Sequence, residues 1–135
     1  MPYRFLEHTA DVRMEVKGKD LKGLFSGAMA GMMAFLRPKV LGEIVGVKRQ
    51  ISLSSPDATA LLVDFLGEVL RLSQTNKEAY HKAVFHKLSE NSLEAELFGV
   101  PVESFEDDIK AVTYHEAKVA KNEKGEWQTL IVFDI

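Results

Sequence analysis

Two aspartates and the chain terminus bring carboxylate groups to opposite ends of this sequence. Asp11 follows a polar break in an N-terminal strand pattern, and Asp134 precedes the terminal carboxylate of Ile135 at the end of a C-terminal strand pattern. If the two strands lie close in one sheet, three carboxylates converge, and their mutual repulsion favours a bound cation. Calcium and magnesium prefer such oxygen ligands. We therefore predict a divalent-metal site at Asp11, Asp134 and Ile135, with a turn or capping role as the alternative for Asp11.

Histidines and the familiar catalytic motifs add little to this site. His8 and His115 are the imidazoles nearest to it by motif, and each is either a metal ligand or a hydrogen-bonded histidine at a strand end. His81 and His86 lie five residues apart on one expected strand, so we expect both at the surface and on opposite faces. The sequence has no Gly-x-Ser-x-Gly elbow, phosphate loop or paired-histidine protease motif. The residues alone do not predict an enzyme.

Composition places the chain among ordinary globular proteins. It has 135 residues, 46% hydrophobic and 27% charged, which predicts one domain with a core of its own. The net charge of −3 provides no global basic field for nucleic acid. The absence of cysteine excludes disulfides and thiolate chemistry. No signal peptide is visible, and the most apolar stretch, residues 24–36, is too short to span a bilayer, so we expect a cytoplasmic protein without a membrane partner.

Apolar periodicity predicts two helices. The first begins at Asp20 as N-cap and ends before Pro38. Its glycines at 23, 27 and 31 share one face, which favours close approach to a sheet or another helix over contact with a cofactor. The second begins at Ser55-Pro56-Asp57, with the serine hydroxyl as cap, and runs to about Ser73.

Alternating patterns predict about seven strands. They cover residues 3–7, 12–18, 47–53, 79–88, 92–98, 110–121 and 127–134. The fourth and fifth form a hairpin around Glu90-Asn91, and the acidic stretch 99–109 is expected to be a solvated loop. The last strand is apolar on both faces, which predicts a place inside a sheet. Together with the helices, this gives one α+β domain over residues 1–135.

Three short motifs make the chain resemble a known family along essentially its full length. They are Leu-Glu-His-Thr-Ala-Asp-Val at 6–12, Lys-Ala-Val-Thr-Tyr-His at 110–115, and the ending Asp134-Ile135. In this order and at this chain length, the sequence resembles the archease family. The resemblance implies an α+β fold with sheets of mixed direction packed around two helices.

The resemblance also implies a function. Archeases are non-catalytic activators of the tRNA-splicing RNA ligase of the RtcB class, which is guanylylated on a histidine with GTP and manganese and then joins RNA ends. An archease promotes guanylylation and multiple turnover, and meets RNA only through the ligase. Family members bind a divalent metal, typically calcium, through acidic residues matching Asp11 and Asp134. On this hypothesis His8, Lys110, His115 and Glu116 surround the metal-bound acidic patch and engage the ligase.

Departures from the family pattern and two rival functions stay open at this stage. Family members usually have glycine where this chain has Arg13, and a histidine in the loop that here spans residues 100–109 without one. One rival is a metal-dependent hydrolase, with Asp11 and Asp134 holding the ion and His115 as general base. The other is a chaperone-like module for RNA-modifying proteins or RNA, which the negative net charge and the lack of a basic–aromatic cluster disfavour.

Overall fold

The central strand pair of the larger sheet forms because both strands alternate buried and outward-facing residues. Val12, Met14 and Val16 are buried along β2 (Asp11–Gly18). Ile131 and Phe133 are buried along β9 (Trp127–Asp134), opposite Met14 and Val12. Both strands therefore turn one apolar face toward the core. β9 lies inside the sheet as predicted, with β2 as its neighbour on one side and β7 and β8 as its neighbours on the other.

The computed structural model describes residues 2–6, 11–42 and 45–135. The helices are α1 (Leu21–Leu36) and α2 (Ala58–Asn76). The other strands are β1 (Tyr3–Leu6), β3 (Pro38–Val40), β4 (Val47–Ser54), β5 (Glu78–Leu88), β6 (Ser92–Phe105), β7 (Ala111–Thr113) and β8 (Ala120–Lys121). One sheet has the order β1-β2-β9-β7 with β8 also on β9, and the other has β6 paired with β3, β4 and β5.

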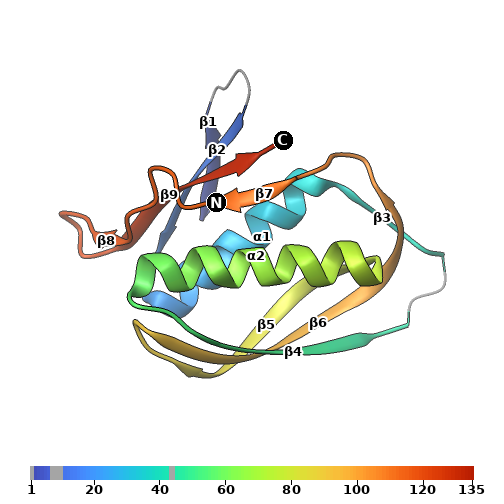
Figure 1. The fold of residues 1–135 in the computed structure, drawn as a ribbon, viewed down its shortest axis with the longest axis horizontal. Helices are drawn as coiled ribbons and strands as arrows, with labels where there is room; N and C mark the ends of the chain where they lie inside the picture. The colour runs from blue at the N-terminus through green and yellow to red at the C-terminus, as the bar shows by residue number, and fades with distance from the viewer. Residues whose placement is uncertain (1, 7–10, 43–44) are drawn as a thin grey trace.

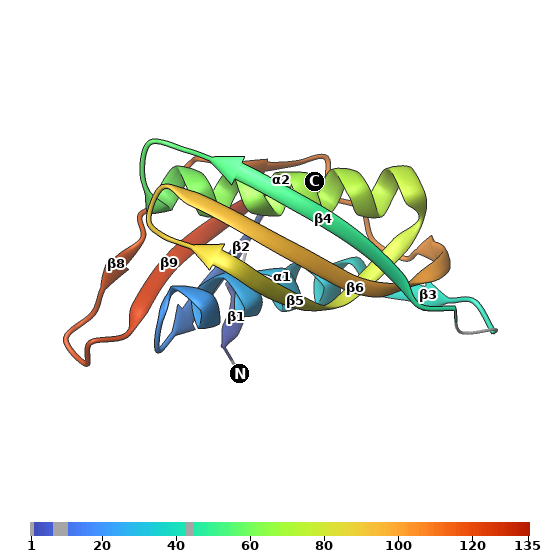
Figure 2. The same ribbon diagram turned by 90° about the horizontal axis from the view of Figure 1, so that it is seen from below.

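The two helices lie between the two sheets (Figure 1). α1 packs on β2 of the larger sheet and on β5 of the smaller one, and α2 contacts β7, β4 and β5. From below, β4, β6 and β5 form a layer that crosses both helices (Figure 2). The α+β class is confirmed, although all strand pairs of the described residues are antiparallel where mixed directions were expected. Neither helix has the length and apolar character needed to cross a membrane.

α1 follows the prediction closely. The carboxylate of Asp20 accepts a hydrogen bond from the Gly23 N–H at 2.7 Å, which is the expected N-cap. The glycine face packs against β1 and β2. A Cβ added at Gly31 would lie 2.4 Å from the Met14 sulfur and 2.8 Å from the Tyr3 ring. Close approach to a sheet, rather than a cofactor, explains this glycine spacing.

α2 begins later and ends later than predicted. Its N-cap is Asp57, whose carboxylate accepts from the Ala60 N–H at 2.8 Å. The predicted cap Ser55 instead donates its hydroxyl to Asp64 at 2.6 Å. Sequence alone does not decide between two capping residues that lie two positions apart, because serine and aspartate cap about equally well. The helix continues past Ser73 to Asn76.

The strand predictions were least accurate where pairing is long-range. The described residues form nine strands rather than about seven. β6 runs to Phe105, through most of the predicted loop, because β5 and then β3 pair with its second half. The predicted strand 110–121 is two short strands, β7 and β8, separated by a turn segment.

The hairpin and its histidines are partly as predicted. The turn lies at Glu90-Asn91, between the end of β5 and the start of β6. His81 and His86 are both exposed, and His86 lies 3.3 Å from Glu96. Register shifts occur at each histidine, so simple alternation does not assign them to opposite faces.

A buried carboxylate joins the smaller sheet to the end of α2. Glu78 is 4% exposed and accepts two hydrogen bonds from the Arg49 guanidinium, at 2.9 and 2.8 Å. The Tyr80 hydroxyl donates to the same carboxylate at 2.7 Å, and the Ser73 hydroxyl donates to the Glu78 carbonyl at 2.6 Å. The hydrogen bonds from Arg49 lower the pKa of Glu78 despite its burial. Burial raises the pKa of Tyr80.

We expect Glu78→Gln to lower the free energy of unfolding by about 2 kcal/mol at neutral pH, because it removes a charge-assisted, bidentate pair. Folding lowers the pKa of Glu78 from its ordinary value of 4.5. The contribution of Glu78 to the free energy of unfolding is therefore complete above pH 4.5 and is lost as the pH falls through the lower, folded-state pKa. Urea denaturation from pH 7 to pH 3 measures this. The control is Glu90→Gln at the exposed hairpin turn, and an equal loss in both variants would contradict the prediction.

Candidate functional site

The pairing of β2 with β9 places the two predicted metal aspartates directly opposite each other. Asp11 and Asp134 are cross-strand partners in the antiparallel register. Because Val12 and Phe133 point into the core, both aspartates lie on the outer face of the sheet. Opposite residues in such a ladder have Cβ atoms roughly 5 Å apart. Two carboxylates from the two ends of the chain therefore face each other across one ladder step.

A third strand completes this end of the sheet. β7 pairs with β9 so that Ala111 lies opposite Asp134, and the Lys110 N–H donates to the Asp134 carbonyl at 2.7 Å. The Lys110 side chain is exposed. Ile135 is half-buried, and its side chain packs against the core. The backbone of Asp134 is thus fixed on both sides.

The segment after β7, residues 114–119, is attached to both the sheet and α2; we call it the strap. At its start, the Thr113 hydroxyl donates to the Val132 carbonyl at 3.0 Å. The Tyr114 hydroxyl donates to Asp64 of α2, and this hydrogen bond raises the pKa of Tyr114. At the far end, the Val119 N–H donates to the Thr59 hydroxyl at 2.9 Å.

An ion pair ties the middle of the strap to β2. Arg13 Nη2 lies 2.9 Å from Glu116 Oε1. Glu116 has a φ of 61°, a left-handed conformation that non-glycine residues adopt only rarely. The Nε of Arg13 is buried and has no hydrogen-bond partner among the described residues. Arg13 occupies the outer face two residues from Asp11, so the pair borders the aspartates.

The structure brings some of the predicted residues together and leaves others apart. Asp11 is paired with Asp134, and the backbone N–H of Lys110 donates to the Asp134 carbonyl. Glu116 forms an ion pair with Arg13, which is two residues from Asp11 along β2. His115 is exposed, and its side chain forms no hydrogen bond within the described part of the chain. His8 lies outside the described residues.

The donor set at the aspartate pair matches a hard cation in kind. Carboxylate oxygens such as those of Asp11 and Asp134 are the ligands that calcium prefers. Within residues 2–6, 11–42 and 45–135, no three His, Asp or Glu side chains gather in a way that could hold a metal. The metal site therefore stays a prediction that depends on the backbone-terminal carboxylate as third donor.

Sequence reasoning missed the contacts that hold the strap. The Tyr114–Asp64 and Val119–Thr59 hydrogen bonds join residues 50 and 60 positions apart, and Arg13 and Glu116 are 103 apart. A single sequence carries no signal for such pairs. Arg13 stood out only as a departure from the family pattern.

Comparison with known proteins decides the family. The sequence matches the archease protein family over residues 3–135. The chain belongs to the archease family. It is 34% identical to the archease of Methanosarcina acetivorans, across 98% of this chain and 95% of that protein. It is 28% identical to an archease-like protein of Drosophila melanogaster, across 100% of this chain and 91% of that one.

Solved structures share the fold. The solution structure of Methanobacterium thermoautotrophicum protein 1598 superposes with a TM-score of 0.70 at 22% identity, covering 99% of both chains. The crystal structure of a Thermotoga maritima archease, described as a possible chaperone, gives a TM-score of 0.70 at 20% identity, covering 96% of this chain and 94% of that one. The archease fold, with both helices between its sheets, is thus common to all three.

In this archease-family chain, Arg13 is expected to hold the strap in place. We expect Arg13→Ala to speed amide hydrogen exchange in residues 114–119 by about fivefold, because the link to Glu116 is lost. Exchange measured by mass spectrometry checks this. Arg4→Ala is the matched control, since Arg4 pairs with Glu15 at 3.0 Å on the same face but away from the strap. Equal exchange in the two variants would show that Arg13 does not hold the strap.

Proposed function

We propose that this protein is a non-catalytic, divalent-metal-binding activator of a tRNA-splicing RNA ligase of the RtcB class. It would promote guanylylation and multiple turnover of the ligase, and would meet RNA only through it. Membership of the archease family supports the proposal, and one observation carries its chemistry: the register that sets Asp11 opposite Asp134.

The metal would be held by Asp11, Asp134 and the carboxylate of Ile135, and calcium is the ion that best suits this set. The ion supplies positive charge between carboxylates that would otherwise repel one another. The protein's own contribution is rigidity. β2, β9 and β7 meet at this end, and the Lys110 N–H fixes the backbone of Asp134. A cation bound there would join the two ends of the chain in one fixed acidic surface.

That surface would lie on the outer face of the sheet, around Asp11 and Asp134, where it could contact a partner protein. Lys110, His115 and Glu116 are all exposed around it, and His8 precedes it in sequence. An effector shifts an equilibrium only when it binds one state better than another. Activation then requires that this surface bind the guanylylation-competent state of the ligase more tightly than the other states.

The same geometry gives less support to the rival functions. A metal-dependent hydrolase would need a base placed against the metal-bound water, and no hydrogen bond from the described residues orients the His115 ring. The description of the Thermotoga maritima relative as a possible chaperone agrees with a protein-binding role in general terms. We therefore keep activation of the ligase, rather than catalysis, as the proposal.

We expect Asp11→Asn and Asp134→Asn each to weaken calcium binding at least about tenfold and to reduce ligase activation in parallel, because each removes a charged ligand. Calorimetry with calcium and a guanylylation assay of the cognate ligase measure the two effects. A chelator in the same assay should act on the wild type as the substitutions do.

The matched control for this test is Glu123→Gln, which removes one exposed carboxylate in the turn before β9. It should leave calcium binding and activation unchanged. Full activation by Asp11→Asn, with calcium binding lost, would refute the metal-dependent mechanism. Activation absent from the wild type as well would refute the proposed function itself.

A further inference from the structure

A groove of about 700 Å³ lies on the outer face of the larger sheet, beyond the aspartate pair. Its lining includes Leu6, Glu15, Lys17, Glu116, Lys118 and Leu130. The strap forms one wall and the outward side of β2 and β9 forms the base. We call it the Lys118 groove. Its size is within the range of sites that bind small molecules or short peptide segments.

The charged side chains that line the groove are Lys17, Lys118, Glu15 and Glu116. Its two carboxylates are already paired, Glu15 with Arg4 at 3.0 Å and Glu116 with Arg13 at 2.9 Å. Lys118 forms no ion pair with the described residues. Lys17 reaches Glu15 only at 3.9 Å, and that carboxylate is shared with Arg4. The lining thus holds two lysines and two glutamates. Because each glutamate is already paired with an arginine, the ammonium groups of Lys17 and Lys118 are the charges most available to a ligand.

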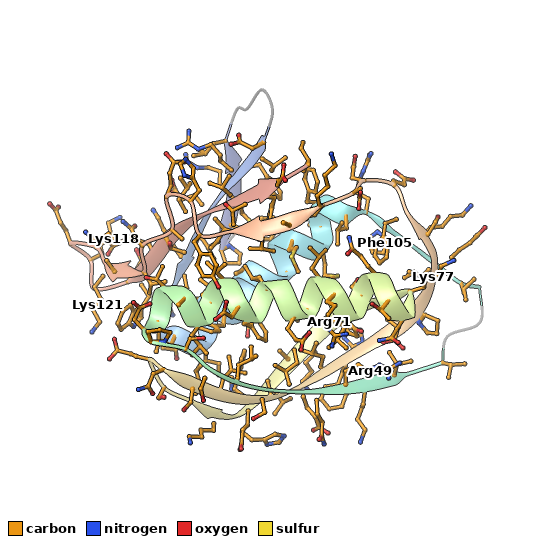
Figure 3. The ribbon with its side chains drawn as sticks, in the orientation of Figure 1. Arg49, Arg71, Lys77, Phe105, Lys118 and Lys121 are labelled. Atoms are coloured by element: carbon orange, nitrogen blue, oxygen red, sulfur yellow. The ribbon has the colours of Figure 1, made fainter. Side chains whose placement is uncertain are left out.

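The base of the groove is apolar between its charged walls. Leu6, Leu130 and Ala120 line it, and the first two are only half-buried on the outward side of the sheet. Half-exposed leucines beside Lys118, and beside Lys17 with its long contact to a shared carboxylate, favour a ligand that has both aliphatic side chains and negative charge. Figure 3 shows Lys118 extending from the strap near β8, with Lys121 beyond it.

We propose that the Lys118 groove binds an acidic peptide segment of a partner protein that also carries aliphatic side chains. Its carboxylates pair with Lys17 and Lys118, and its leucine- or valine-like side chains cover Leu6 and Leu130. Gln128 also lines the groove and stands opposite Lys17 in the β2–β9 register. Its side-chain oxygen accepts from Asn122 at 3.2 Å, so its amide N–H groups can donate to a peptide carbonyl.

Nucleic acid fits the groove less well. Proteins that hold single strands add aromatic side chains on which bases stack, and none of the residues lining this groove is aromatic. The ring of Trp127 does lie near, but it is 5.2 Å from the Lys121 ammonium and belongs to the inward-facing row beside Gly18. A lining of leucine and lysine side chains without aromatic rings suits a peptide better than a nucleic acid.

This inference goes beyond the proposed function, because Lys17 and Lys118, which would pair with the peptide, are not part of the aspartate site; Glu116 borders both. Lys17 is six residues from Asp11 along β2, which is about 20 Å in an extended strand. Exposed charges are screened over about 8 Å at physiological salt, so the aspartates do not cancel the charge at Lys17. Peptide binding therefore requires neither calcium nor the ligase.

Fluorescence anisotropy with the full chain tests the proposal. The probe is a labelled, acetylated peptide that alternates Asp, Glu and Leu. We expect saturable binding that weakens with added NaCl. Lys17→Glu combined with Lys118→Glu should weaken it about tenfold, because two attractive pairs become repulsive. Leu130→Ser should weaken it about threefold, a loss that a purely ionic surface would not show.

The control for the charge reversals is Lys22→Glu combined with Lys87→Glu. Both lysines are exposed and form no ion pair within the described ranges, and the change in net charge is the same. The control should bind the peptide like the wild type, with circular dichroism confirming the fold of every variant. Equal losses in both double variants would overturn the proposal. So would preferential binding of oligouridylate at this groove. The anisotropy assay contains neither metal nor ligase, so an absence of peptide binding would not count against the proposed function. An absence of ligase activation would likewise not count against peptide binding at the Lys118 groove.

Discussion

The antiparallel pairing of β2 with β9 is the interaction on which the rest of the structure depends. It joins the first twenty residues to the last ten, with eight paired positions from Asp11–Asp134 to Gly18–Trp127. A shift of one residue would turn Val12, Met14 and Val16 outward and would separate the aspartates. The burial of these side chains therefore enforces the register. The same register places two carboxylates opposite each other. The burial of the core side chains offsets the electrostatic repulsion between them.

The strap is the second consequence of that pairing. β7 and β8 each cover only a short part of β9, and residues 114–119 leave the sheet between them. The Thr129 hydroxyl accepts from the Lys118 N–H at 3.0 Å, so a side chain replaces the missing ladder bond. Hydrogen bonds to Asp64 and Thr59 of α2 hold the strap on its other side. A segment without regular structure is thus fixed to the sheet and to a helix, and it forms a wall of the groove.

Sequence patterns predicted what local physics controls. Helix α1, with Asp20 as its cap, and the alternating strands β2 and β9 follow from spacing and capping chemistry. The same reasoning predicted too short a strand at β6, because the second half of β6 is held as a strand by pairing with β3 and β5. At the site, Asp11 and Asp134 were predicted from their residue types and positions. The contacts of Arg13, Tyr114 and Thr59 were not, because they depend on how distant segments meet in the folded chain.

Arg13 lies between the acidic residues on the outer face of the larger sheet. It stands between the row of Asp11 and Asp134 and the row of Glu15, and it is paired with Glu116 from the strap. A glycine there would leave Glu116 without its cation, and the groove would then carry one more unpaired carboxylate. With arginine, the Glu116 carboxylate is paired, and the ammonium groups of Lys17 and Lys118 remain available to a ligand of the groove. The aspartate pair and the groove can therefore share one sheet face, because the half-buried Arg13 lies between them and pairs with the carboxylate of Glu116.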